Sequence, residues 1–333
     1  MKFSQYSFGM GVVAIATGLV ACEKPYHQPE ERYVLVVTNA DLPYWQEAQA
    51  GLNDMGKTAG VKVEMTGPSK FSPSEELKEF ERVVGQHPAG ILVSASDAAL
   101  FKEPIDKAIL QGIPVICMDS DSPESRRVLF IGTDNFRAGQ ESGKRMAELL
   151  GGQGNIVLIS LKGQFNTEER VRGVNEALKK YPGVKVVDTF DDRGDPRNAY
   201  DAVSDMLQKK KQKIDGIICL EASGGQGAAD VLHRFDMTGK IKIVAFDKDP
   251  LTLEAIERGW ITATVVQKPY VMAFYGVRFL DDLHHNVVHE FKDWATAPTA
   301  PLPTFVDTGT AVVDAANLAA FRRALAKHPK PVL

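Results

Sequence analysis

The feature that most constrains this fold is a series of short hydrophobic runs and amphipathic segments that occurs twice along the chain. The first run, residues 33–37 (YVLVV), is wholly apolar and rich in β-branched residues, which is typical of a strand buried on both faces of a parallel sheet. Corresponding first runs begin at residues 33 and 155, and corresponding fourth runs at 113 and 241. The pattern predicts two similar doubly wound α/β lobes.

The length of the chain agrees with two lobes, because 333 residues exceed one typical hydrophobic core. After the second repeat we expect a helix over residues 269–285, a Pro-rich connection over 295–303, and two short strands with a last helix. We therefore assign residues 32–133 plus 267–297 to an N-terminal lobe and 134–266 plus 298–330 to a C-terminal lobe.

The N-terminus predicts export from the cytoplasm. Lys2 precedes an apolar stretch, residues 8–20, that is too short to span a bilayer stably. The stretch ends in LVAC, a pattern similar to a bacterial lipobox, so we expect residues 1–21 to be a lipoprotein signal peptide and Cys22 to carry lipid. Residues 22–31 read as a polar tether. A plain secretory signal with a chance cysteine, or a retained membrane anchor, are the alternatives.

Charge and cysteine content narrow the function. The net charge is −4 and the isoelectric point is about 6.0, which argues against a nucleic-acid partner. Cys117 and Cys219 each lie in an apolar strand run, one in each half, and are expected to be buried free thiols.

Polar and aromatic residues gather where strands end. Tyr44 and Trp45 follow the first strand, and Asp119 and Asp247 end the fourth strand of each half. In open α/β sheets, ligands bind at the carboxyl ends of the strands. Carboxylates accept hydrogen bonds from vicinal hydroxyls, so a sugar or polyol between the lobes is indicated. The alternatives are that both rings belong to the core and that the acids cap the next helix.

An ordered set of motifs resembles the periplasmic sugar-binding proteins of the ribose/galactose-receptor type. The matching pieces are VVTNADLPYWQEAQAGL, GIPVICMDSD, IGTDNFRAGQESG, EERVRGVNEAL, IVAFDKDP and GWITATVVQKP. The resemblance implies a type I periplasmic binding protein fold, in which three crossovers act as a hinge between the lobes. It also implies a monomeric solute receptor, without catalysis or cofactor, that delivers its ligand to an ABC importer permease or, alternatively, to a sensory partner.

The resemblance also implies the ligand contacts. Tyr44 and Trp45 would stack on a sugar ring, Asp119 and Asp247 would bind hydroxyls, and Arg170 would donate from the second lobe. Gln267 and Asn135 would contribute from the hinge, and Glu221 from the end of a strand. Leu42, Ser120, Glu221 and Gly194 depart from the ribose pattern. We therefore expect another sugar, a sugar alcohol or a cyclic signalling polyol rather than ribose.

Two other sequence features suggest different chemistry, namely a nucleotide-dependent enzyme and a metal site. SGGQGAAD, residues 223–230, follows a predicted strand and opens a helix as a dinucleotide fingerprint does, but Asp230 stands at its third small position and would repel a pyrophosphate. His284, His285 and His289 have helical spacing that suits a metal ion. We interpret them as a solvated helix end and predict no metal site.

Overall fold

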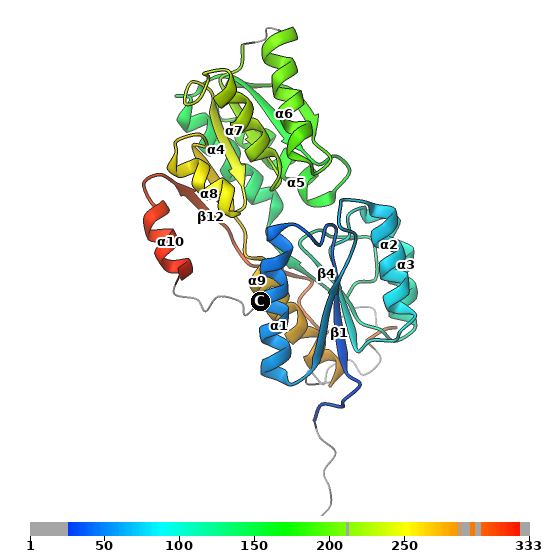
Figure 1. Cartoon of the computed structure of the whole chain (residues 1–333). Coiled ribbons are helices and arrows are strands. Elements are labelled where there is room, and N and C mark those ends of the chain that lie inside the picture. The colour runs from blue at the N-terminus through cyan, green and yellow to red at the C-terminus, as the bar shows by residue number, and fades with distance from the viewer. Residues whose placement is uncertain (1–25, 211–212, 286, 288–293, 297–300, 327–333) are drawn as a thin grey trace, which may run out of the picture.

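The computed structural model describes residues 26–210, 213–285, 287, 294–296 and 301–326. These residues form two α/β lobes, one above the other (Figure 1). The predicted signal peptide, Cys22 and the start of the tether lie outside the described residues, as does His289.

The first lobe is built on a six-stranded parallel sheet in the order β11-β5-β4-β3-β1-β2. Its strands are β1 (Arg32–Val36), β2 (Lys62–Thr66), β3 (Gly90–Val93), β4 (Val115–Met118), β5 (Leu129–Gly132) and β11 (Phe305–Asp307). Its helices are α1 (Pro43–Ala59), α2 (Pro73–Val84), α3 (Ala98–Leu110) and α9 (Pro269–His284). Helices α1 and α9 lie side by side on one face of the sheet, and α2 and α3 on the other (Figure 1).

The second lobe repeats this topology, with the order β12-β10-β9-β8-β6-β7. Its strands are β6 (Gln153–Ser160), β7 (Gly183–Asp191), β8 (Gly216–Cys219), β9 (Lys242–Phe246), β10 (Ala263–Val266) and β12 (Ala311–Asp314). Its helices are α4 (Asn135–Leu149), α5 (Phe165–Leu178), α6 (Pro196–Asp205), the π-helical turn η1 (Met206–Lys210), α7 (Gly224–Arg234), α8 (Pro250–Glu257) and α10 (Leu318–Ala326). Among the strands of this lobe in the described residues, β12 alone runs antiparallel to its neighbour. The predicted repeat of two doubly wound lobes is thus confirmed.

The chain crosses between the lobes three times, as predicted. It crosses from β5 to α4, from β10 to α9, and from β11 to β12. One predicted boundary is wrong, because residues 298–330 do not all lie with the second lobe. Strand β11 pairs with β5 of the first sheet, and Phe305 stacks on Phe130 with ring centroids 5.3 Å apart. The last crossing therefore lies after Asp307, where pairing along the open edge of β5 ends.

The apolar runs of the sequence form strands that are buried in the cores of the two lobes. The side chains of β3, β4, β5 and β8 are all buried, as expected for parallel strands covered on both faces. Cys117 and Cys219 are buried free thiols in this core, as predicted. Within the residues described, none of the helices combines the length and the apolar character needed to cross a bilayer.

Candidate ligand-binding site

A cavity lies between the two lobes at the carboxyl ends of both sheets. The first lobe lines it with Thr38, Asn39, Leu42, Tyr44, Trp45, Phe71 and Asp119. The second lobe lines it with Leu161, Gln164, Asn166, Thr167, Arg170, Gly194, Glu221, Ala222 and Asp247, and Gln267 lines it from a crossover. Seven of the eight predicted contact residues are in this list; Asn135 is not.

Asp119 and Asp247 occupy equivalent positions on opposite walls. Each follows the fourth strand of its lobe and has a backbone φ of 69°. Each donates its backbone N–H to the fifth strand, to the carbonyl of Ile131 over 3.1 Å and of Val265 over 2.8 Å. The alternative of helix capping does not hold for Asp247, because the side chain of Asp249 caps α8.

Burial raises the pKa of both carboxyl groups. Asp119 is 5% exposed and Asp247 is 7% exposed. Desolvation raises the pKa of Asp247 to about 7, although the guanidinium of Arg170 opposes the shift. Desolvation also raises the pKa of Asp119 against the opposing effects of Arg170 and a hydrogen bond from Tyr44. The ionised forms of these two acids are shielded from water and depend on hydrogen-bond donors in the cavity for stabilisation.

Arg170 is the centre of the polar network. Its three guanidinium nitrogens donate to Asn135 Oδ1 over 2.9 Å, to the carbonyl of Leu220 over 2.8 Å and to Gln267 Oε1 over 2.9 Å. Gln267 in turn donates to Asp247 Oδ1 over 3.0 Å. Asn135, predicted to touch the ligand, instead orients this arginine.

The two aromatic residues that follow Pro43 differ in their surroundings. The Tyr44 hydroxyl donates to Asp119 Oδ1 over 2.6 Å, and burial together with that carboxylate raises the pKa of the phenol well above its usual value. Trp45 is 2% exposed and packs edge-on against Tyr44 with ring centroids 5.0 Å apart. Trp45 is therefore a core residue that also lines the cavity. For this residue the core interpretation and the cavity interpretation of the sequence both hold.

Glu221 has a local role that the sequence did not indicate. Its carboxylate accepts the backbone N–H groups of Ser223 and Gly224 at the start of α7. Asp192 lies beside it, and burial next to the Glu221 charge raises the pKa of Asp192 to about 11. This helix terminus is thus already capped by a carboxylate. That arrangement disfavours a bound pyrophosphate and with it the dinucleotide interpretation of residues 223–230.

Asn166, Asn39 and Phe71 are among the cavity residues that the sequence did not predict as ligand contacts. Asn166 lies four residues before Arg170, and hence on the same face of α5; its Nδ2 donates to Asp119 Oδ2 over 3.2 Å. Asn39 follows β1, and Phe71 comes from the loop before α2. The helical spacing from Arg170 could have identified Asn166, but a single aromatic residue in a loop gives no such signal.

The lobes are closed on each other in this structure. The Asn166–Asp119 bond joins α5 of the second lobe to the end of β4 in the first. An ion pair of 2.6 Å joins Lys248 Nζ to Glu47 Oε1, again across the lobes.

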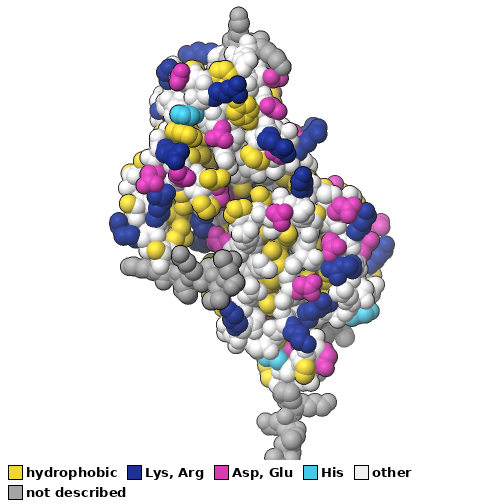
Figure 2. Space-filling model, viewed as in Figure 1, with side chains coloured by type: hydrophobic (Ala, Val, Ile, Leu, Met, Phe, Trp, Pro, Cys, Tyr) yellow, Lys and Arg dark blue, Asp and Glu magenta, His cyan; other side chains and the backbone are white. Residues whose placement is uncertain are grey.

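On the face shown in Figure 2, acidic and basic side chains are interspersed over both lobes.

Comparisons with known proteins agree with this architecture. The chain is 27% identical over 260 residues to the D-allose-binding periplasmic protein of Escherichia coli, covering 75% of this chain and 83% of that protein. A sugar-binding protein of a sugar ABC transporter from Bacillus halodurans has a TM-score of 0.78 and 32% identity, with coverage of 87% and 100%. A Burkholderia graminis solute-binding protein in complex with D-arabinose has a TM-score of 0.80 and 28% identity, with coverage of 92% and 100%. A family model described as periplasmic binding protein domain matches residues 33–285, and the chain belongs to that family.

Proposed function

We propose that this protein is an extracytoplasmic solute receptor that captures a sugar or sugar-like polyol between its lobes and delivers it to an ABC importer. The observation that carries the proposal is the pair of buried carboxyl groups, Asp119 and Asp247, that line one cavity from opposite lobes. Sugar hydroxyl groups would add donors to those that Tyr44, Asn166 and Gln267 already supply to the two carboxylates. The ligands named for the relatives, D-allose and D-arabinose, are of this chemical class.

The rest of the cavity suits the same ligand. Asn39, Gln164 and Asn166 offer amide groups that both donate and accept hydrogen bonds. Tyr44, Trp45 and Phe71 offer ring surface against which the C–H face of a sugar packs. A sugar has hydroxyl groups around its edge and C–H groups on its faces, so the mixture of polar and aromatic residues matches it.

The mechanism that we propose is capture by population shift and involves no reaction. A ligand that contacts Asp119 in one lobe and Asp247 in the other binds the closed form more tightly than the open form. The three crossovers bend as the hinge. The closed receptor then presents both lobes to the importer.

We further propose that the receptor is held at the membrane by lipid. The LVAC pattern supports cleavage before Cys22 and attachment of lipid to this residue. The proposed lobes are residues 32–133 with 267–307 and residues 134–266 with 308–326, so that the last predicted boundary moves to the end of β11.

A thermal-shift screen of aldoses, ketoses and sugar alcohols tests the proposed ligand class. At least one compound is expected to raise the melting temperature, because binding to the folded state alone adds RT ln(1 + [L]/Kd) to its stability, about 2.7 kcal/mol at a hundredfold excess over Kd. If no sugar or polyol shifts the transition, the proposed ligand class is wrong.

A further inference from the structure

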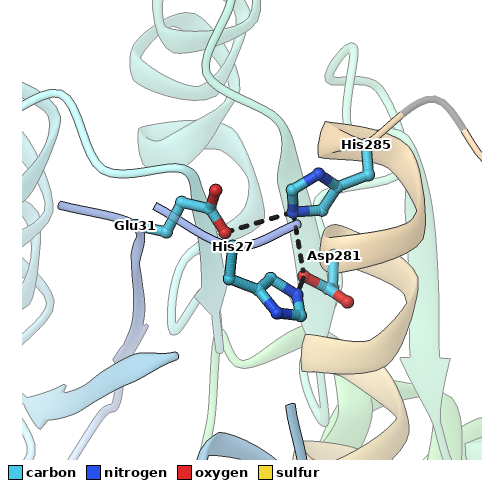
Figure 3. A group of neighbouring side chains, drawn as sticks. All are labelled: His27, Glu31, Asp281 and His285. Carbon is cyan, nitrogen blue, oxygen red and sulfur yellow. Dashed lines mark hydrogen bonds and ion pairs between the residues drawn. The ribbon is translucent and has the colours of Figure 1, made fainter. Parts of the chain in front are cut away.

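Four potential metal-binding side chains meet at the end of the first lobe that is remote from the cavity. Asp281 lies in the last turn of α9, His285 directly follows the end of that helix, and His27 and Glu31 come from the segment that leads into β1 (Figure 3). One ligand atom of each residue lies within 4.8 Å of all the others. Glu31 precedes the amino end of β1, whereas the cavity lies at the carboxyl ends of the strands, so the cluster is separate from the proposed sugar site.

The distances within the cluster fit a four-coordinate ion. His27 Nε2 is 3.0 Å from Asp281 Oδ1, and His285 Nε2 is 3.1 Å from Glu31 Oε2 and 3.6 Å from Asp281 Oδ1. Four ligand atoms about 2.0–2.2 Å from a tetrahedral zinc ion lie roughly 3.4 Å from one another. The observed separations lie on both sides of that value, so small side-chain rotations would admit an ion.

Neighbouring groups hold both carboxylates in place. The Tyr33 hydroxyl donates to Asp281 Oδ1 over 3.1 Å, and the backbone N–H of Gln28 donates to Glu31 Oε1 over 2.7 Å, leaving Oε2 toward His285. Asp281 is 1% exposed and Glu31 is 6% exposed. Outer partners of this kind fix the orientation of ligands in known metal sites.

The chemistry of the four donors selects the ion. Two imidazoles and two carboxylates suit zinc or a similar divalent transition metal, and are a poor match for calcium or magnesium, which prefer oxygen ligands. Hydrogen bonds alone would need the imidazoles to pair with the carboxylates one by one. The convergence of all four groups on one point, with two nearly buried negative charges to neutralise, is what favours a cation.

We propose that His27, Glu31, Asp281 and His285 form a structural site for a divalent transition metal ion, with zinc as the best match. With four protein ligands the site is closed, which is typical of structural rather than catalytic zinc. The ion would fasten the end of the predicted tether, which contains His27 and Glu31, to the C-terminal end of α9. The bonded partners are 254 residues apart in the sequence, so the helical spacing of His284, His285 and His289 gives no sign of this site.

The test is a metal titration of the full chain, purified in detergent with a tag that contains no histidine and stripped with a chelator. We expect one zinc ion to bind per chain, and Co²⁺ to give the intense visible absorption of a tetrahedral complex. H27Q and H285Q should each lower zinc affinity about 100-fold or more, while keeping an N–H that can donate to the carboxylates. Y33F, which removes an outer donor, should lower it about tenfold.

The matched control is H233Q, in the last turn of α7 in the second lobe and outside the cluster. It should bind zinc as the wild type does. The proposal is overturned if the wild type binds no stoichiometric zinc, if the H27Q/H285Q double variant binds it with unchanged affinity, or if H233Q loses as much affinity as H285Q. Melting curves without metal establish that each variant folds, and a glutamine variant that does not fold is replaced by the corresponding asparagine variant.

Discussion

Asp119 and Asp247 share a backbone φ of 69° at the ends of equivalent strands in the two lobes. Non-glycine residues rarely adopt this left-handed conformation, which costs on the order of 1–3 kcal/mol. In both lobes the backbone N–H bond to the fifth strand fixes the turn, and both side chains line the cavity. Strain repeated at two equivalent positions supports a shared binding role for the two carboxylates.

Replacing Asp247 by Asn should abolish sugar binding while the protein stays folded. Asparagine tolerates the left-handed conformation, but its amide lacks the charge that holds two hydroxyl donors. The sugar-induced rise in melting temperature should disappear in D247N and persist in D201N, a control at an exposed position of α6. An unchanged sugar response in D247N would remove Asp247 from the site.

The raised pKa of Asp247 makes the stability of the free protein depend on pH. Its pKa is about 7 in the folded state and about 3.9 when unfolded, so the folded state binds the extra proton between these values. The free energy of unfolding should therefore fall as the pH rises from about 4 to about 7, by up to about 4 kcal/mol. D247N should lack this part of the fall.

Urea unfolding of both proteins at pH 4, 5.5 and 7.5, without sugar, measures the difference. The wild type should gain stability relative to D247N as the pH is lowered. Parallel pH profiles would show that Asp247 ionises normally in the fold.

The ion pair between Lys248 and Glu47 should favour the closed form. Its atoms are 2.6 Å apart, and the side chains are 13% and 31% exposed, so its contribution is about 0.5–1.5 kcal/mol. K248M should enlarge the radius of gyration of the free protein in X-ray scattering and weaken sugar binding about 2- to 10-fold. K179M removes the ion pair between Lys179 and Glu176 at the end of α5 and should change neither the radius of gyration nor the sugar affinity. Equal effects of K248M and K179M would rule out a role of the Lys248–Glu47 pair in closure.

Cys22 should be the site of lipid attachment. Cells grown with radiolabelled palmitate should label the wild type and C117S, but not C22S, because Cys117 is a buried thiol. Absence of label in the wild type would mean that the N-terminal segment is a plain signal or a retained anchor.

The order of the elements was predictable because it rests on local patterns. The wholly apolar runs are typical of parallel strands that are covered on both faces. Because the same pattern occurs twice, it also predicted a second lobe like the first. The end of the chain was less predictable. Residues 305–307 are too short to show a pattern, and their place beside β5 depends on an edge formed some 170 residues earlier.

The site was predictable in position and less so in detail. Asp119 and Asp247 could be inferred because strand ends are marked in the sequence. The supporting role of Asn135 could not, since it depends on how the Arg170 side chain crosses to α4. The cap formed by Glu221 and the cluster around His285 likewise arise from side-chain directions that no spacing rule records.

Calorimetric titration of a sugar and polyol panel into the wild type and the D119N/D247N double variant tests the central claim most directly. We predict that at least one sugar binds the wild type with one ligand per chain, and that the double variant gives no binding heat for it. Binding of that sugar to the double variant with unchanged affinity would contradict the account, as would the absence of any sugar or polyol that binds the wild type.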